Sequence, residues 1–308
     1  MKKSLIIHPE ELSTKWIDKI SELGCDCIGI HPVGGAHSKA SLERLIDMSD
    51  NDEYKRLIDY AIEKGLNIEY EMHAARFLLP ESYFETNPEY FRMNKEGIRT
   101  SDYNFCVSND NALEIICQNS LKLAKNLYKS SNKFYFWLDD SKDAFCHCEK
   151  CKNIKPCDQQ MMVLNAMIKH IRQQIPNAKL AYLAYYETLD LPTVKPADGI
   201  FVEFAPYERD FSLLAQNMKD EHKIILKKLI EFFGTEHSKI LEYWYDNSLF
   251  SDYKKPPKQL IVNNKMIHKD FEFYKSFGVE FVASFACYLG DDYLELYGEP
   301  DLSAFKVL

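Results

Sequence analysis

Two adjacent carboxylates, Asp139 and Asp140, end the apolar aromatic run at residues 134–138. Paired carboxylates cleave glycosidic bonds when one is protonated and the other is ionised. Repulsion between neighbouring aspartates separates their pKa values. Successive strand side chains point to opposite faces, so both acids can meet one substrate only where the strand has ended. The sequence predicts either this catalytic pair, or a loop-capping Asp139 with Asp140 working alongside a carboxylate on another strand, such as Glu242.

Four cysteines follow the acidic pair, at Cys146, Cys148, Cys151 and Cys157. Four thiolates can surround a tetrahedral zinc ion and staple an irregular loop. The spacing C-x-C-x2-C-x5-C differs from the usual pair of C-x2-C knuckles, and His147 could replace one thiolate. We expect a structural zinc site, with packed free thiols or a disulfide as alternatives, and no organic cofactor. The other cysteines are expected to be small core residues: Cys25, Cys27, Cys106, Cys117 and Cys287.

Histidines end three consecutive predicted strands, at His8, His31 and His73. Together with Glu71 or Glu242 they could hold a catalytic divalent metal, as in barrel hydrolases and isomerases. Strand-end histidines also hydrogen-bond substrates. A metal-dependent sugar isomerase or hydrolase is therefore an alternative to carboxylate catalysis, and a sugar-binding barrel without turnover is a third reading.

Aromatic side chains gather near the same strand ends, and flat aromatic faces with polar tips suit sugar rings. By alternation, half of them must point toward the helices. The aromatics are Tyr185, Tyr186, Tyr207, Tyr243, Trp244 and Tyr245. The residues expected to bind substrate are His31, Glu71, His73, Tyr185, Tyr243 and Trp244.

The elements that must position these residues alternate along the chain. Short runs rich in β-branched and aromatic residues predict strands at 4–8, 26–32, 66–73, 133–140, 179–186, 199–205, 239–246 and 279–286. Helical periodicity predicts helices at 13–23, 52–64, 111–128, 159–174, 221–233 and 263–277. Eight strands with crossover helices favour a single glycosidase-like (β/α)8 TIM barrel spanning residues 1–308, with an open doubly wound sheet as the alternative.

In such a barrel the active residues lie at the carboxyl ends of the strands and in the loops that follow. The long connections 74–109, 141–158 and 247–262 are expected there, and their aromatic content argues against disorder. Alternation places Glu69, Glu71 and His73 inside the barrel, and likewise Glu242, Trp244 and Asp246. Few basic residues lie on the strands, which favours a functional site over an internal ion-pair network.

Composition excludes several classes of partner. The net charge of −9 argues against nucleic acid. No apolar run approaches the roughly 18 residues of a membrane span. Nine cysteines without a signal peptide fit a reducing cytoplasm. A small or partly degraded carbohydrate is the expected substrate, and no sequence feature specifies an oligomeric state.

Three blocks of sequence resemble the glycosidase-like barrel family called domain of unknown function 4838. The first block is Asn87-Pro-Glu-Tyr-Phe91 with Gly97 and Cys106-Val-Ser-Asn109. The second is Asp140 with Cys146-x-Cys148-x-x-Cys151. The third is Tyr185, Thr188 and Pro192 with Lys195-Pro196-x-Asp198.

That family is similar to barrels of the β-hexosaminidase and O-GlcNAcase type. The resemblance implies that the first acid after strand four orients the substrate acetamide, which attacks the anomeric carbon, and that the second protonates the leaving group. Asp139 and Asp140 occupy these positions. The family pattern tends toward Asn-Asp-Gly where this chain has Asp139-Asp140-Ser141, so the resemblance carries over only Asp140.

Overall fold

The computed structural model describes residues 1–127, 131–206 and 214–307; Tyr207 therefore lies outside the described residues. Eight strands form a closed barrel in the order β1 to β8, and the strand pairs with a defined register are parallel. This confirms the expected (β/α)8 barrel. The strands are β1 Lys2–Ile7, β2 Cys27–Ile30, β3 Asn67–His73, β4 Lys133–Trp137, β5 Lys179–Ala184, β6 Ile200–Phe204, β7 Ser238–Glu242 and β8 Phe281–Phe285.

Helices connect most of the strands. The longer ones are α1 Thr14–Glu22, α2 Ser38–Asp50, α3 Asp52–Glu63, α5 Asp110–Leu127, α6 Pro156–Ile171, α7 Asp220–Phe233 and α9 Asn264–Ser276. The shorter ones are α4 Ala75–Leu78, α8 Asn247–Phe250, α10 Asp291–Tyr297 and α11 Ser303–Val307. Helix α2 was not predicted, because two of its four buried positions are Ser38 and Ser49, which weakens its apolar period. None of the helices in the described ranges combines the length and apolar composition of a membrane span.

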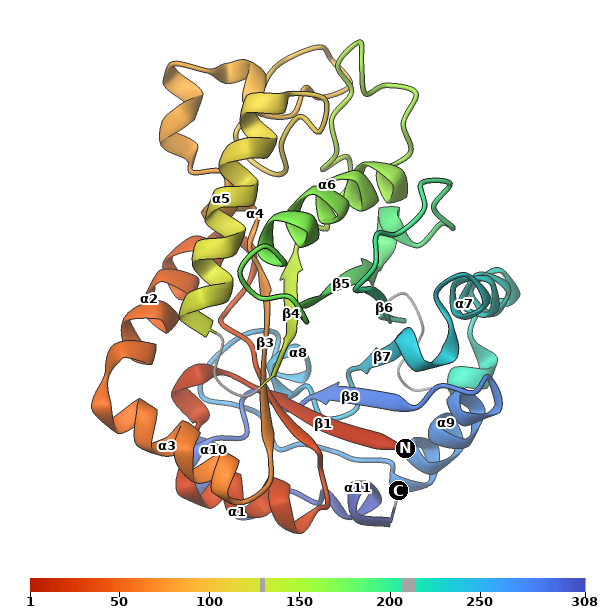
Figure 1. The fold of residues 1–308 in the computed structure, drawn as a ribbon. Coiled ribbons are helices and arrows are strands. Elements are labelled where there is room, and N and C mark those ends of the chain that lie inside the picture. Colours follow the sequence, from red (N-terminus) through yellow and green to blue (C-terminus); the bar gives the residue numbers. More distant parts are fainter. Residues whose placement is uncertain (128–130, 207–213, 308) are drawn as a thin grey trace. The chain divides into compact units, whose positions relative to one another are not determined.

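The chain forms two compact units, and both contribute strands to the barrel. The first comprises Met1–His31, Asp50–Tyr70 and Glu203–Leu308, and the second Pro32–Ser49 and Glu71–Val202. In the first, β1 pairs with β8 and β2, and Lys3 Nζ donates to the carbonyl oxygens of Leu23 and Phe305. In the second, α5 packs against α6, which covers β5 (Figure 1).

Seven of the eight strands end earlier than the sequence predicted, and β3 ends at His73 as expected. Strand β4 ends at Trp137, three residues before Asp140, and β7 ends at Glu242, four residues before Asp246. Asp139 and Asp140 therefore lie beyond the regular strand, where the alternation of faces no longer separates them.

The inner face of β7 differs from the prediction. Lys239 is 1% exposed, and its Nζ lies 2.9 Å from Glu203 Oε1 and 3.9 Å from Glu69 Oε2. Lys239 therefore points into the barrel, and Glu242, three residues later, points to the opposite face. The acids Glu69 and Glu203 belong to an internal ion-pair network, which corrects the expectation that basic partners were too few for one.

The long loop at 74–109 is structured. It contains α4 and two 3-10 turns, Glu81–Glu85 and Pro88–Tyr90. Antiparallel bridges join Phe91 to Phe105 and Met93 to Arg99. These contacts bring the end of the loop back beside its middle, and the ordered loop agrees with the expectation that its aromatic content argues against disorder.

Candidate active site

Asp139 and Asp140 lie just after β4 and are held by an asparagine from the 74–109 loop. The buried Asn104 side chain accepts from the Asp139 amide N–H and donates to the Asp139 carbonyl, at 2.8 Å each. This pair of hydrogen bonds satisfies the Asp139 peptide groups that the strand no longer pairs. The backbone of the acidic pair is thereby fixed.

The two carboxyls occupy different environments. Burial raises the pKa of Asp139 above its ordinary value of 3.8, as does the neighbouring charge of Asp140, while His73 and Arg76 act in the opposite direction. Asp139 Oδ2 is buried and accepts no hydrogen bond from the described residues. The Asp140 side chain is 36% exposed. The pair thus combines a buried acid with an acid that solvent reaches.

His73 ends β3 beside Asp140. Its Nε2 lies 3.8 Å from Asp140 Oδ2, close enough for an ion pair when the imidazole is protonated. Its Nδ1 lies 3.1 Å from the Leu138 carbonyl oxygen, and its ring meets the Trp137 ring edge-on at 5.4 Å. A Cβ on Gly34 would come within 3.1 Å of His73 Cδ2, so a side chain there would press on the imidazole.

Arg92 braces the loops on both sides of the pair. It is 4% exposed, and its Nε and Nη2 donate to Asp102 at 3.0 and 2.8 Å. Its Nη1 donates to the Asp143 carbonyl at 2.8 Å. A buried guanidinium that makes bidentate hydrogen bonds to a carboxylate is held in a fixed orientation. Arg92 therefore ties the 74–109 loop to the 141–158 loop.

Sequence reasoning missed Asn104 and Arg92. Each acts on a residue 35 to 51 positions away in the chain. No local pattern marks such a contact in a single sequence. One indirect hint was present in the sequence, since the nearby residues Phe91 and Cys106 belong to the first block that resembles the family.

Three of the residues expected to bind substrate lie in the same unit as the acidic pair: His73, Glu71 and Tyr185. Glu71 is buried on β3, two residues before His73. Tyr185 directly follows β5, is half-buried, and its ring lies 6.3 Å from that of Tyr186. Their contact with substrate stays a prediction.

Glu242 and Trp244, in the other unit, make different contacts from those expected. Glu242 is fully buried, and its Oε1 accepts a hydrogen bond of 2.5 Å from the hydroxyl of Tyr274 on α9. Trp244 is 4% exposed, and its Nε1 donates to the buried Asp270 at 3.0 Å. Both side chains are thus bound to the outer helix layer, which corrects their predicted place on the inner face of β7.

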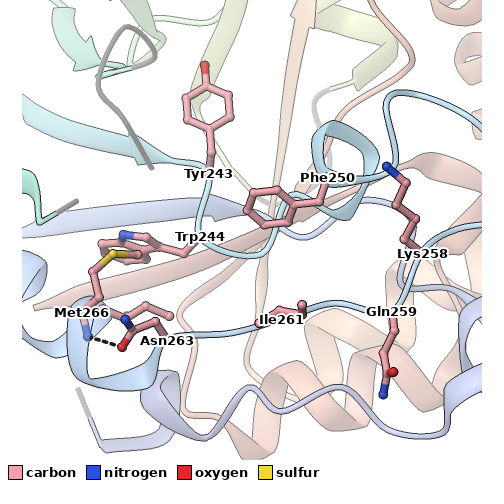
Figure 2. A pocket seen from close by; sticks show the side chains of 9 residues that line it. Tyr243, Trp244, Phe250, Lys258, Gln259, Ile261, Asn263 and Met266 are labelled. Carbon is pink, nitrogen blue, oxygen red and sulfur yellow. Dashed lines mark hydrogen bonds between the residues drawn. The ribbon is translucent and has the colours of Figure 1, made fainter. Parts of the chain in front are cut away.

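Tyr243 is half-buried and lies beside Phe285, with ring centroids 5.3 Å apart. It borders a pocket of about 510 Å³ formed by the segment after β7, α8 and the start of α9, whose other lining residues are Trp244, Phe250, Lys258, Gln259, Ile261, Asn263, Met266 and Ile267. In Figure 2 the Tyr243 side chain points away from the other labelled residues, while Trp244 and Met266 lie together. The mostly apolar lining with a few polar groups could accept a small ligand.

The three strand-end histidines are not gathered around a common point within either unit. His8 and His31 belong to one unit, where their rings stack with centroids 6.0 Å apart and His8 Nδ1 lies 2.7 Å from the His31 carbonyl oxygen. Across the residues that the structure describes, the group of side chains able to hold a metal is a cysteine cluster, and it includes no histidine. The histidine metal site therefore gains no support.

The cysteine cluster consists of Cys106, Cys146, Cys148 and Cys151. This corrects the predicted set at one position. Cys157 lies in the first turn of α6, and its thiol faces the Leu191 carbonyl oxygen at 3.9 Å. Cys106, which was expected to be a core residue, takes its place because the 74–109 loop folds onto the 141–158 loop.

The model of the family described as "Domain of unknown function (DUF4838)" matches residues 44–292. No curated protein sequence matches the chain.

Solved structures of glycoside hydrolases are similar to this one. The β-N-acetylhexosaminidase from Bacteroides fragilis aligns at a TM-score of 0.60 and 13% identity, over 99% of this chain and 65% of that chain. A catalytic module of the pneumococcal exo-β-D-N-acetylglucosaminidase StrH gives 0.51 and 13%, over 99% and 82%. Endo-glycoceramidase II from Rhodococcus gives 0.52 and 10%, over 93% and 72%. At these identities the likeness shows the fold alone, and the chain spans about two thirds of the first of these proteins.

Proposed function

The chain belongs to the DUF4838 family, and we propose that it is a glycoside hydrolase in which Asp139 and Asp140 act on a small or partly degraded glycan bearing an N-acetyl group. The observation that carries this proposal is the pairing of the buried Asp139, whose Oδ2 lacks a hydrogen-bond donor among the described residues, with the accessible Asp140. The similar folds of two N-acetylhexosamine-cleaving enzymes support the choice of sugar.

Asp139 is suited to orient the substrate. A buried carboxyl oxygen without a donor costs free energy, and the N–H of a substrate acetamide supplies the missing hydrogen bond. That bond turns the acetamide oxygen toward the anomeric carbon. The acetamide oxygen bonds to the anomeric carbon as the bond from that carbon to the leaving group breaks, which closes a ring. Water later attacks the anomeric carbon and opens this ring.

Asp140 is suited to protonate the leaving group. Its exposure leaves it open to a departing sugar oxygen, and His73 lies close enough to hold it in place. The proton moves from the Asp140 carboxyl to the glycosidic oxygen as that bond breaks. The carboxyl then takes a proton back from the water that attacks in the second step.

Hydrolysis of a panel of aryl glycosides, including N-acetylglucosaminides and glucuronides, tests this proposal. We expect the wild type to cleave N-acetylated members. Asp140→Asn should be slowed about 10²–10⁴-fold on substrates with poor leaving groups and much less on dinitrophenyl glycosides, which leave without a proton. Asp139→Ala should lose activity on every N-acetylated substrate, whatever the leaving group.

Two outcomes would contradict the proposal. One is turnover in Asp140→Asn that equals the wild type on poor leaving groups. The other is saturable glycan binding by the wild type with no product from any substrate, which would identify a sugar-binding barrel instead.

A further inference from the structure

Four buried thiols meet where the 74–109 loop contacts the 141–158 loop. Cys106 comes from the 74–109 loop, and Cys146, Cys148 and Cys151 come from the 141–158 loop. Their sulfur atoms all lie within 4.8 Å of one another. The sequence predicted a cluster of four cysteines from the 141–158 segment alone. In the structure, Cys106 from another loop replaces Cys157 in the cluster.

The spacing of the sulfurs suits a tetrahedral metal ion. Zinc-to-sulfur bonds of about 2.3 Å place the sulfurs of a tetrahedron about 3.8 Å apart. The Sγ of Cys106 lies 3.6 Å from that of Cys148 and 3.8 Å from that of Cys151. A disulfide would need about 2.05 Å, so neither of these pairs is bonded.

The surroundings of the thiols suit negatively charged sulfur. The Met93 amide N–H donates to Cys146 Sγ at 3.4 Å, and Arg99 Nη1 donates to the same sulfur at 3.8 Å. Four thiolates around a divalent ion leave a net charge of −2, which the Arg99 guanidinium partly offsets. Donors around the sulfurs are the outer contacts that metal-binding cysteines require.

We propose that Cys106, Cys146, Cys148 and Cys151 bind one zinc ion that fastens the 74–109 loop to the 141–158 loop. Each loop contributes ligands, so the ion closes a link that neither loop makes alone. The site goes beyond the proposed hydrolysis, in which none of its ligands has a role.

The zinc site also steadies the acidic pair. Asn104, which holds both backbone groups of Asp139, lies two residues before Cys106. When Cys106 is bound to the ion, Asn104 has little freedom to move away from the Asp139 backbone. Loss of the ion should therefore expose the Asp139 amide N–H, whose hydrogen bond to Asn104 Oδ1 would break more often.

Metal analysis of the purified full chain tests the proposal. We expect one zinc per chain in the wild type, loss of the metal in Cys106→Ser, and full retention in Cys157→Ser, the matched control outside the cluster. If Cys106→Ser does not fold, wild type exchanged with cobalt gives the same answer, since four thiolates around cobalt produce strong sulfur-to-metal absorption. In zinc-free protein the Asp139 amide should exchange hydrogen about tenfold faster.

Three results would overturn the proposal. The first is wild-type protein that takes up no metal after reconstitution with zinc or cobalt. The second is equal loss of metal in Cys157→Ser and Cys106→Ser. The third is a disulfide between any two of the four cysteines in freshly purified protein. Iron in place of zinc would overturn the identity of the ion.

Discussion

At the scale of single residues, the decisive feature is the contrast between Asp139 and Asp140. Desolvation of Asp139 disfavours its charged form more than His73 and Arg76 favour it, so its pKa in the folded protein is raised. The neighbouring negative charge of Asp140 adds to the same effect. A carboxyl of this kind is poised for a substrate donor and costs the protein stability whenever it is ionised.

This leads to a prediction for the pH dependence of stability. A raised folded pKa contributes stability below the unfolded pKa, and that contribution is lost as the pH rises through the folded pKa. Asparagine does not titrate. The free energy of unfolding of the wild type should therefore fall relative to that of Asp139→Asn as the pH rises from about 4 toward neutrality. Urea denaturation of both proteins across this range measures the difference; a constant or rising difference would contradict the raised pKa.

At the scale of elements, β7 shows what alternation alone can predict. Its two faces are Ser238, Ile240 and Glu242 on one side, and Lys239 and Leu241 on the other. Each face mixes apolar and charged residues, so alternation alone could not decide which one points inward, and the prediction that the Glu242 face does so was wrong. The choice depends on Glu69 and Glu203, which lie on other strands and pair with Lys239. With Lys239 on the inner face, one buried cation pairs with two buried carboxylates. Glu242 on that face would instead add a further buried negative charge.

The same network gives a prediction at this scale. Lys239→Met would leave Glu69 and Glu203 in the barrel without this cation, and should lower the free energy of unfolding by about 3–5 kcal/mol. Adding Glu69→Gln and Glu203→Gln should recover much of the loss. Lys227→Met, at a solvated position on α7, is the control and should change little. Unfolding in urea measures all four proteins, and a Lys239→Met protein as stable as the wild type would refute the network.

At the scale of the whole molecule, the barrel followed from periodicity, whereas the site depended on contacts between distant segments. All eight strands were predicted, because each is a compact run of strand-forming residues between helical stretches. The contact of Cys106 with Cys148 spans 42 residues, and the hydrogen bonds between Asn104 and Asp139 span 35. Such contacts leave no local trace, so the fold of the loops was needed to find them.

The most direct test of the account compares Asp140→Asn with Glu242→Gln on an aryl N-acetylglucosaminide with a poor leaving group. Sequence alone allowed Glu242, in place of Asp139, as the second catalytic carboxylate beside Asp140, but Glu242 is bound to Tyr274 in the helix layer. We predict that kcat/KM falls about 10²–10⁴-fold in Asp140→Asn and stays within a few-fold of the wild type in Glu242→Gln. Loss of activity in a folded Glu242→Gln protein, with activity kept in Asp140→Asn, would contradict the account.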